Sequence, residues 1–164
     1  MPEIQIRTAT ANDSSLILNF IKELALYEKA ESEVVATVEN IKNSIFCENS
    51  NSHALICCLD AKPIGFAVYF YNYSTWLGKK GLYLEDLYVS PEHRQQGIGK
   101  TLFKYIANIA VKEDCGRFEW SVLTWNQPAI EFYKSFSAEP QSEWVTYRLS
   151  GVALQNSATG INND

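Results

Sequence analysis

The sequence predicts one mixed α/β domain, and two observations support this class. Short apolar segments of the kind found in strands occur between segments whose apolar residues recur every three or four positions, as in helices. The chain has 164 residues, 46% of them hydrophobic, which suffices for one substantial core and is too short for two ordinary domains. We therefore expect a single domain over residues 1–150 and a polar tail over residues 151–164.

The N-terminal half of the chain predicts a strand, two helices and a β-hairpin. Asn12 or Asp13 can cap a first helix, and Thr37 can cap a second. The strand patterns lie at residues 4–7, 53–59 and 64–71. Residues 60–63 read Asp-Ala-Lys-Pro, a turn-like tetrapeptide, so the last two strands are expected to pair as a hairpin.

The C-terminal half alternates strands and helices. Residues 82–89 read as a strand, and apolar positions at helical spacing follow from Gly97 until Cys115-Gly116. Residues 118–125 read as a buried strand, and Pro128 suits the first turn of another helix. Residues 144–149 predict a last strand, and residues 155–164 are polar and are expected to be frayed or disordered.

The segment HRQQGIGK, residues 93–100, joins the strand at 82–89 to the next helix. Its glycines let the backbone approach a ligand closely, and the amides of a first helical turn point outward at the positive end of the helix dipole. This arrangement favours an anion, and it predicts a phosphorylated cofactor. An ordinary loop at the start of a helix is the alternative interpretation.

Two familiar phosphate motifs fail against this segment. A P-loop needs a glycine where Arg94 stands, and no aspartate-terminated apolar strand follows to hold magnesium. The dinucleotide fingerprint needs a third glycine where Leu102 stands. The pattern that fits is Arg-x-x-Gly-x-Gly.

Charge and composition exclude several classes of function. A net charge of −5 argues against a nucleic-acid binder that works through a basic surface, and it fits a cationic or amine partner. The N-terminus is no signal peptide and no apolar run reaches membrane-spanning length, so we expect a cytoplasmic protein without a membrane partner. The four cysteines lack metal-like spacing and the two histidines lie far apart, so no metal site is expected.

Several segments together resemble one enzyme group. They are ELALYE at residues 23–28, YLEDLYV at 83–89, the Arg-x-x-Gly-x-Gly loop, and WNQP at 125–128 with the helix that continues to Lys134. They resemble the diamine acetyltransferases of the GNAT superfamily, namely spermidine/spermine N-acetyltransferase and its thialysine-acetylating relatives, over residues 4–149. The resemblance implies the GNAT fold, with a seven-stranded mixed sheet flanked by about four helices, acetyl-CoA as cofactor and a homodimer.

The chemistry requires a base, because an alkylammonium has a pKa of about 10.4 and must lose a proton before it attacks a thioester. Strand alternation puts Glu85 on one face with Leu87 and Val89, and Asp86 on the other. We expect apolar neighbours to desolvate Glu85 partly and to raise its pKa. The resemblance implies that Glu85 binds the amine and helps to deprotonate it; a salt bridge at the rim of the sheet is the alternative.

The resemblance also assigns the cofactor site and the acid. By spacing alone Tyr133 is one more aromatic on a helix face, whereas the resemblance makes it the general acid that protonates the departing thiolate. It implies direct transfer in a ternary complex. The cofactor-binding positions are the backbone of Leu87, Tyr88 and Val89, the loop residues Arg94, Gln95, Gln96, Gly97, Ile98, Gly99 and Lys100, and Asn126, Pro128, Ala129 and Tyr133.

The acceptor is expected to be a small cationic molecule with a primary amine, either a polyamine or diamine, or a thialysine-like amino acid. Its predicted binding residues are Tyr27, Glu28, Glu85, Asp86, Trp76 and Glu143. Ser74 stands where the family has an acid, and Ser137 where it usually has a glycine. Two alternatives remain: an acetyltransferase of a protein lysine or N-terminus, and a CoA-binding regulatory module without catalysis.

Overall fold

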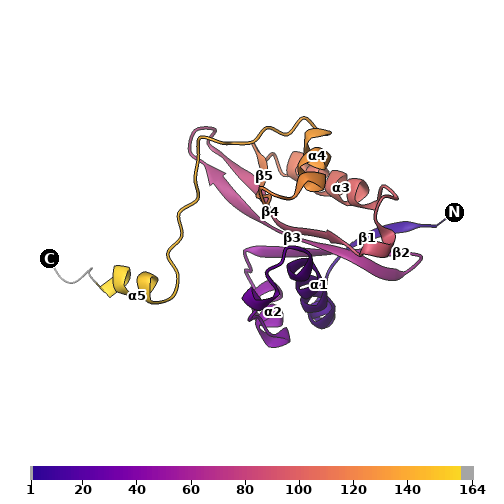
Figure 1. The fold of residues 1–164 in the computed structure, drawn as a ribbon, viewed down its shortest axis with the longest axis horizontal. Helices are drawn as coiled ribbons and strands as arrows, with labels where there is room; N and C mark the ends of the chain where they lie inside the picture. Colours follow the sequence, from indigo (N-terminus) through magenta and orange to yellow (C-terminus); the bar gives the residue numbers. More distant parts are fainter. Residues whose placement is uncertain (1, 160–164) are drawn as a thin grey trace. The chain divides into compact units, whose positions relative to one another are not determined.

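The computed structural model describes residues 2–159, in two units that meet between Leu123 and Thr124 and are treated separately here (Figure 1). The first unit holds five strands: β1 (Ile4–Thr8), β2 (Ser52–Leu59), β3 (Lys62–Ser74), β4 (Lys79–Val89) and β5 (Phe118–Trp120). It also holds the helices α1 (Ser14–Tyr27), α2 (Val38–Ile45) and α3 (Ile98–Lys112). The second unit holds α4 (Gln127–Lys134) and α5 (Gly151–Thr159).

The five strands form one mixed sheet in the order β1-β2-β3-β4-β5. The first four pair antiparallel, and β5 pairs parallel to β4 after the α3 crossover. The mixed α/β class is therefore confirmed. The count of seven strands is wrong for the described residues, which contain five.

One predicted strand, at residues 144–149, accounts for part of this difference, and another is shorter than expected. β5 ends at Trp120, so the expected strand at residues 118–125 is shorter than predicted. Residues 144–149 are extended but belong to no sheet, and Tyr147 is 93% exposed. Their composition suits a strand, but a strand also needs a hydrogen-bonded neighbour, and the sheet of the first unit does not include them.

The polar tail is also more ordered than expected up to Thr159. Residues 155–159 form the second half of α5, a helix without buried residues. The remainder of the predicted frayed segment, residues 160–164, lies outside the described residues.

Helices cover both faces of the sheet. α1 and α2 lie on one face and α3 on the other (Figure 1). The core under α1 and α2 contains stacked rings, with the Phe20 and Phe66 centroids 5.6 Å apart and Tyr88 at 5.8 Å from Phe20. On the opposite face, Phe103 of α3 stacks on Phe118 at 5.0 Å. Both faces of β4 are thus packed, which fixes the strand that carries the predicted site.

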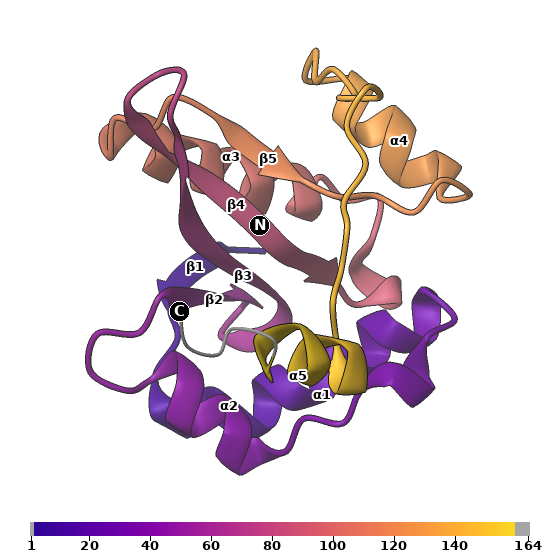
Figure 2. The ribbon, with the colours of Figure 1, turned by 90° about the vertical axis from the view of Figure 1, so that its left-hand side faces the viewer.

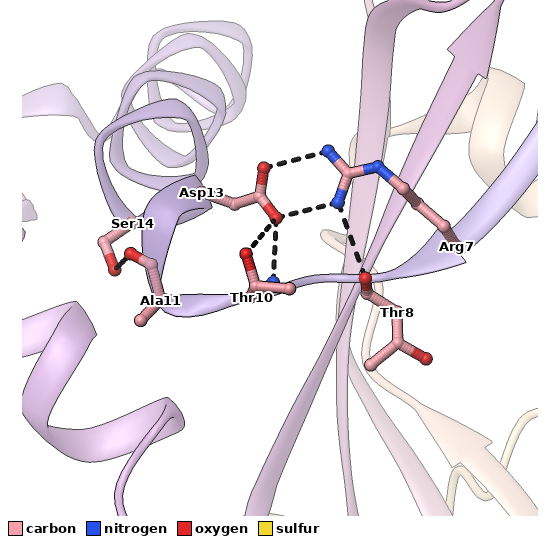
Figure 3. A network of polar contacts seen from close by, with 6 residues as sticks. All are labelled: Arg7, Thr8, Thr10, Ala11, Asp13 and Ser14. Atoms are coloured by element: carbon pink, nitrogen blue, oxygen red, sulfur yellow. Dashed lines mark hydrogen bonds and ion pairs between the residues drawn. The ribbon is translucent and has the colours of Figure 1, made fainter.

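The junction between β1 and α1 is held by a charged network (Figure 3). The Arg7 guanidinium donates to both carboxylate oxygens of Asp13, at 2.8 and 2.9 Å, and the Thr10 amide donates to Asp13 Oδ2 at 2.8 Å. The hydrogen bonds from Arg7 lower the pKa of Asp13, against the effect of burial. Asp13 occupies the N-cap position of α1, as expected for Asn12 or Asp13, but its side chain binds Arg7 and Thr10 in place of the α1 amides.

The predicted cap of α2 is confirmed. The Asn40 amide donates to Thr37 Oγ1 at 3.1 Å, and the Thr37 amide donates to Asn40 Oδ1 at 2.9 Å. The predicted hairpin is confirmed too, with a tighter turn. Asp60 and Ala61 alone connect β2 to β3, both in the left-handed region at φ 48° and 67°, as a two-residue hairpin turn of type I′ requires.

Candidate functional site

A β-bulge interrupts β4 where the two predicted acids lie. Leu87 pairs with Ala67 and Asp86 with Val68, but the next residue of β3, Tyr69, pairs with Leu84. Glu85 is therefore the extra residue of the bulge. A bulge bends its strand and reorients the side chains next to it, and bulges are common beside active sites.

The bulge gives the two adjacent acids different environments. Asp86 lies on the face of Val68, under α1, and is half-buried, whereas Glu85 is exposed. Burial, together with the negative charges of Glu85 and Glu28, raises the pKa of Asp86 to about 7. The expectation that desolvation would fall on Glu85 is therefore wrong, because regular alternation does not continue through a bulge.

Three of the predicted acceptor residues come together at this point. Glu28 is the C-cap residue of α1 and is close enough to Asp86 for their charges to interact. Burial also raises the pKa of Glu28. Like charges held near one another away from water favour a cation in their midst, since a cation relieves both the repulsion and the desolvation. The cluster of Glu28, Glu85 and Asp86 is hereafter the carboxylate cluster.

An aromatic pair lies beside the carboxylate cluster. Tyr27 ends α1 and Tyr88 follows Asp86 by two positions on the same face of β4. The Arg94 guanidinium carbon is 4.9 Å from the Tyr27 ring centroid and 5.5 Å from that of Tyr88. Burial, followed by a hydrogen bond to Glu23, raises the pKa of Tyr88 to about 12, so this phenol stays protonated at neutral pH.

The predicted anion cradle is present where β4 leads into α3. Gly97 is the N-cap of this 15-residue helix at φ 78°, and Gln95 is left-handed as well, at φ 62°. No side chain caps the first turn, and no acid lies in it. A Cβ placed on Gly97 or Gly99 would meet nothing within 4 Å. The open glycine surface and the uncapped amides of a helix N-terminus fit a phosphate group.

Trp76 and Ser74 lie elsewhere. Both belong to the end of the long β3–β4 hairpin, which extends away from α1 and α2 (Figure 2). Ser74 lies six residues along β3 from Val68, the partner of Asp86, which is roughly 20 Å of strand. Ser74 Oγ accepts a hydrogen bond from the Leu77 amide at 3.2 Å, and Trp76 faces Arg117 at 5.9 Å. Within the first unit, the hairpin end and the carboxylate cluster are separate.

The second unit gathers another set of predicted residues on α4. Asn126 is its buried N-cap, with Oδ1 accepting from the Ala129 amide at 3.4 Å, and Pro128 lies in the first turn. Tyr133 is half-buried, and its ring packs against Phe132 at 5.4 Å. Glu143 is exposed in the turn before residues 144–149.

Sequence reasoning missed two contributors to this region, Glu23 and the side-chain role of Arg94. Glu23 interacts with the Tyr88 phenol and helps to raise its pKa. Its spacing of four residues from Tyr27 places both on one face of α1 and was an available signal. The position of the Arg94 side chain could not be predicted from the sequence. A loop motif predicts the path of the backbone but not the direction of a long side chain.

Comparison with known proteins identifies the family. The acetyltransferase (GNAT) family matches residues 20–137 of the chain. The chain belongs to the GNAT acetyltransferase family. It is accordingly an N-acetyltransferase, and its mixed α/β fold is that of the GNAT family.

Relatives of this GNAT enzyme align along almost its whole length. A thialysine N-epsilon-acetyltransferase of Sus scrofa is 36% identical over 169 residues, with 96% of this chain and 99% of that protein covered. An L-ornithine N5-acetyltransferase of Arabidopsis thaliana is 28% identical, with 92% and 86% covered. Among solved structures, an integron cassette protein from the mobile metagenome of V. cholerae matches with a TM-score of 0.79 at 28% identity, with 94% and 97% covered.

No helix within residues 2–159 is long and apolar enough to cross a lipid bilayer. The same residues contain no group of three or more His, Cys, Asp or Glu side chains placed to hold a metal ion.

Proposed function

We propose that this GNAT enzyme uses acetyl-CoA to acetylate the primary amine of a small cationic acceptor. One observation carries the proposal: the carboxylate cluster lies at the β4 bulge and the end of α1, and β4 leads into an open, uncapped helix N-terminus. The first suits a cation and the second a phosphate. An N-acetyltransferase of this kind has to bind both an anionic cofactor and a cationic acceptor.

The residues of the cradle fit acetyl-CoA. The amides around Gly97 and Gly99 would hold its pyrophosphate, and the backbone at Leu87, Tyr88 and Val89 would hold the pantetheine arm. The resemblance also assigns Asn126, Pro128, Ala129 and Tyr133 to the cofactor. The bound cofactor supplies the acetyl thioester that the amine attacks.

The carboxylate cluster prepares the acceptor. Glu85, exposed at the bulge, binds the ammonium and takes its proton, directly or through water. Asp86 lies next to it with a pKa of about 7, and its charge can therefore change with the charge of the bound amine at neutral pH. By the resemblance, Tyr133 would be the acid whose hydroxyl supplies a proton to the sulfur of the cofactor. Transfer is direct, in a complex of enzyme, cofactor and acceptor.

A thialysine-like amino acid is the acceptor that we favour over a polyamine. The relatives described above act, by their names, on thialysine and on L-ornithine, two amino acids with a side-chain amine. A polyamine carries further ammonium groups, and this chain has Ser74 at a position where the polyamine enzymes have an acid. Serine carries no charge, and Ser74 is in addition 6% exposed and bonded to the hairpin turn.

The test is thiol release from acetyl-CoA with thialysine, ornithine, lysine, spermidine, spermine, putrescine and a lysine peptide. We expect saturable turnover of a free amino acid, a loss of about 100-fold or more in kcat for Glu85→Gln, and a similar loss for Tyr133→Phe with unchanged acetyl-CoA affinity. Preferential turnover of the peptide would favour a protein acceptor. Tight acetyl-CoA binding without turnover of any compound would indicate a non-catalytic CoA-binding module.

A homodimer and a cytoplasmic location complete the proposal, both from the resemblance and the composition. Trp144, Val145 and Tyr147 are 70%, 77% and 93% exposed, which is an unusual amount of apolar surface for a lone chain. Light scattering should give about twice the 18.6 kDa of one chain. A mass of one chain at micromolar concentration would contradict the dimer.

A further inference from the structure

Arg94 opens the Arg-x-x-Gly-x-Gly loop, and sequence reasoning assigned it to the cofactor. Its side chain is half-buried and engaged with the protein. Nε donates to the Val89 carbonyl oxygen at 2.9 Å. The guanidinium carbon is 4.9 Å from the Tyr27 ring centroid and 5.5 Å from the Tyr88 ring centroid. Both distances are within the range of a cation–π interaction.

These contacts connect three elements. Tyr27 is the last residue of α1, Tyr88 and Val89 end β4, and Arg94 precedes the cradle at the start of α3. The same two ends of α1 and β4 hold Glu28 and Asp86 of the carboxylate cluster. One side chain therefore spans from the phosphate loop to the wall of the acceptor site.

The positive charge of Arg94 lies beside the rings of Tyr27 and Tyr88. Its positive charge lowers the pKa of Tyr88, while burial and Glu23 raise it with the larger effect. A planar guanidinium can stack on rings and donate from Nε at the same time, whereas an ammonium offers only a point charge. The observed geometry includes the directed Nε donor and close contacts of the guanidinium with both rings.

We infer that Arg94 is a positioning residue of the acceptor site, which clamps Tyr27 and the end of β4 in the arrangement that receives the amine. The inference rests on the proposed function for the identity of the acceptor. This positioning role and a contact with the cofactor phosphate require different properties of the Arg94 side chain. A phosphate contact needs a positive charge, which lysine retains, and the clamp needs the guanidinium plane and its Nε donor.

Arg94→Lys tests this difference, and Gly99→Ala serves as a matched change on the cofactor side of the same loop. For Arg94→Lys we expect the KM of the amine acceptor to rise about tenfold, more than the Kd of acetyl-CoA measured by calorimetry. For Gly99→Ala we expect the reverse. The inference would be overturned if Arg94→Lys left the amine KM at its wild-type value. It would also be overturned if the substitution weakened only the binding of acetyl-CoA.

A second measurement reads the clamp without any turnover. Urea unfolding of Arg94→Lys, Tyr27→Leu and the double variant gives a coupling between the two positions. We expect the double variant to change the unfolding equilibrium constant at least threefold less than the product of the two single changes. The reason is that either single variant already loses the contact between Arg94 and the Tyr27 ring. Additive shifts would show that no clamp exists. A wild type inactive toward every amine would instead overturn the proposed function, and with it the acceptor role of Arg94.

Discussion

At the residue scale, the main feature is the difference in solvent exposure between two neighbouring carboxylates. Glu85 and Asp86 have similar chemistry, yet the bulge leaves one exposed and puts the other under α1 beside Glu28. A raised pKa on Asp86 means that the fold tolerates its neutral form better than its charged form. The acceptor site therefore carries a cost to stability, as sites that bind cations through desolvated acids generally do.

Asp86→Asn should stabilise the protein at high pH only. The pKa of Asp86 rises from 3.8 to about 7 on folding, so the wild type loses stability as the pH increases from about 4 to about 7. Three units correspond to roughly 4 kcal/mol at most, and we expect about 1–2 kcal/mol at pH 8 because the side chain is only half-buried.

Urea unfolding at pH 4 and pH 8 measures this effect. The gain of Asp86→Asn over the wild type should be absent at pH 4 and present at pH 8. Glu48→Gln, at an exposed carboxylate, is the control and should show little change at either pH. An equal gain at both pH values would mean that burial of Asp86 is not its cause.

At the scale of an element, the start of α3 contains two glycines with different roles. Gly97 is needed for its backbone conformation, and Gly99 for the space that it leaves open to a ligand. Gly97 is left-handed at φ 78°, so Gly97→Ala should cost about 1–2 kcal/mol of stability. Gly99 has no such strain and no atom within 4 Å of an added Cβ. Gly99→Ala should therefore keep the stability and weaken acetyl-CoA binding about tenfold, because the methyl group would occupy the cradle.

Thermal unfolding and calorimetry with acetyl-CoA measure the two effects separately. The prediction requires that stability falls mainly in Gly97→Ala and that Gly99→Ala binds the cofactor less tightly at an unchanged Tm. Wild-type affinity in Gly99→Ala would place the cofactor phosphate elsewhere.

Ser137 shows a similar constraint at the end of α4. The helix ends at Lys134, and Ser137 follows in the left-handed region at φ 62°, a conformation that favours glycine. Ser137→Gly should raise the free energy of unfolding by about 0.5–1 kcal/mol, since glycine adopts this conformation without strain. Ser157→Gly inside α5 is the contrasting change and should not stabilise. A lower Tm for Ser137→Gly would contradict this interpretation.

At the scale of the whole molecule, periodicity predicted the mixed α/β class, the strands β1 to β4 and the helices α1 to α4. The local pattern of apolar residues is enough to predict these helices and strands, because the period of the pattern differs between the two kinds of element. It failed at Glu85, because a bulge is defined by the register of a second strand, which no single segment reveals. It failed at residues 144–149 because strand-like composition does not supply a neighbour.

The candidate site was predictable in parts. The cradle followed from glycine spacing, and the resemblance placed Glu28, Glu85 and Asp86 on the list of acceptor residues. Their meeting depends on how α1 crosses β4, which sequence patterns do not determine. Trp76 shows the opposite case, since a residue assigned to the same site lies at the far end of a hairpin.

The strand order also sets an order of folding. The two-residue turn at Asp60 and Ala61 lets β2 and β3 meet with almost no loop to close, whereas the parallel pair of Leu82 and Phe118 forms only after all of α3 has been bridged. Closing the longer loop costs more chain entropy and slows the contact. We expect amides of β2 and β3 to gain protection in pulsed hydrogen exchange before those of β5, and the reverse order would refute this. The phosphate cradle belongs to that crossover, so affinity for the cofactor should arise late in folding, after the hairpin is complete.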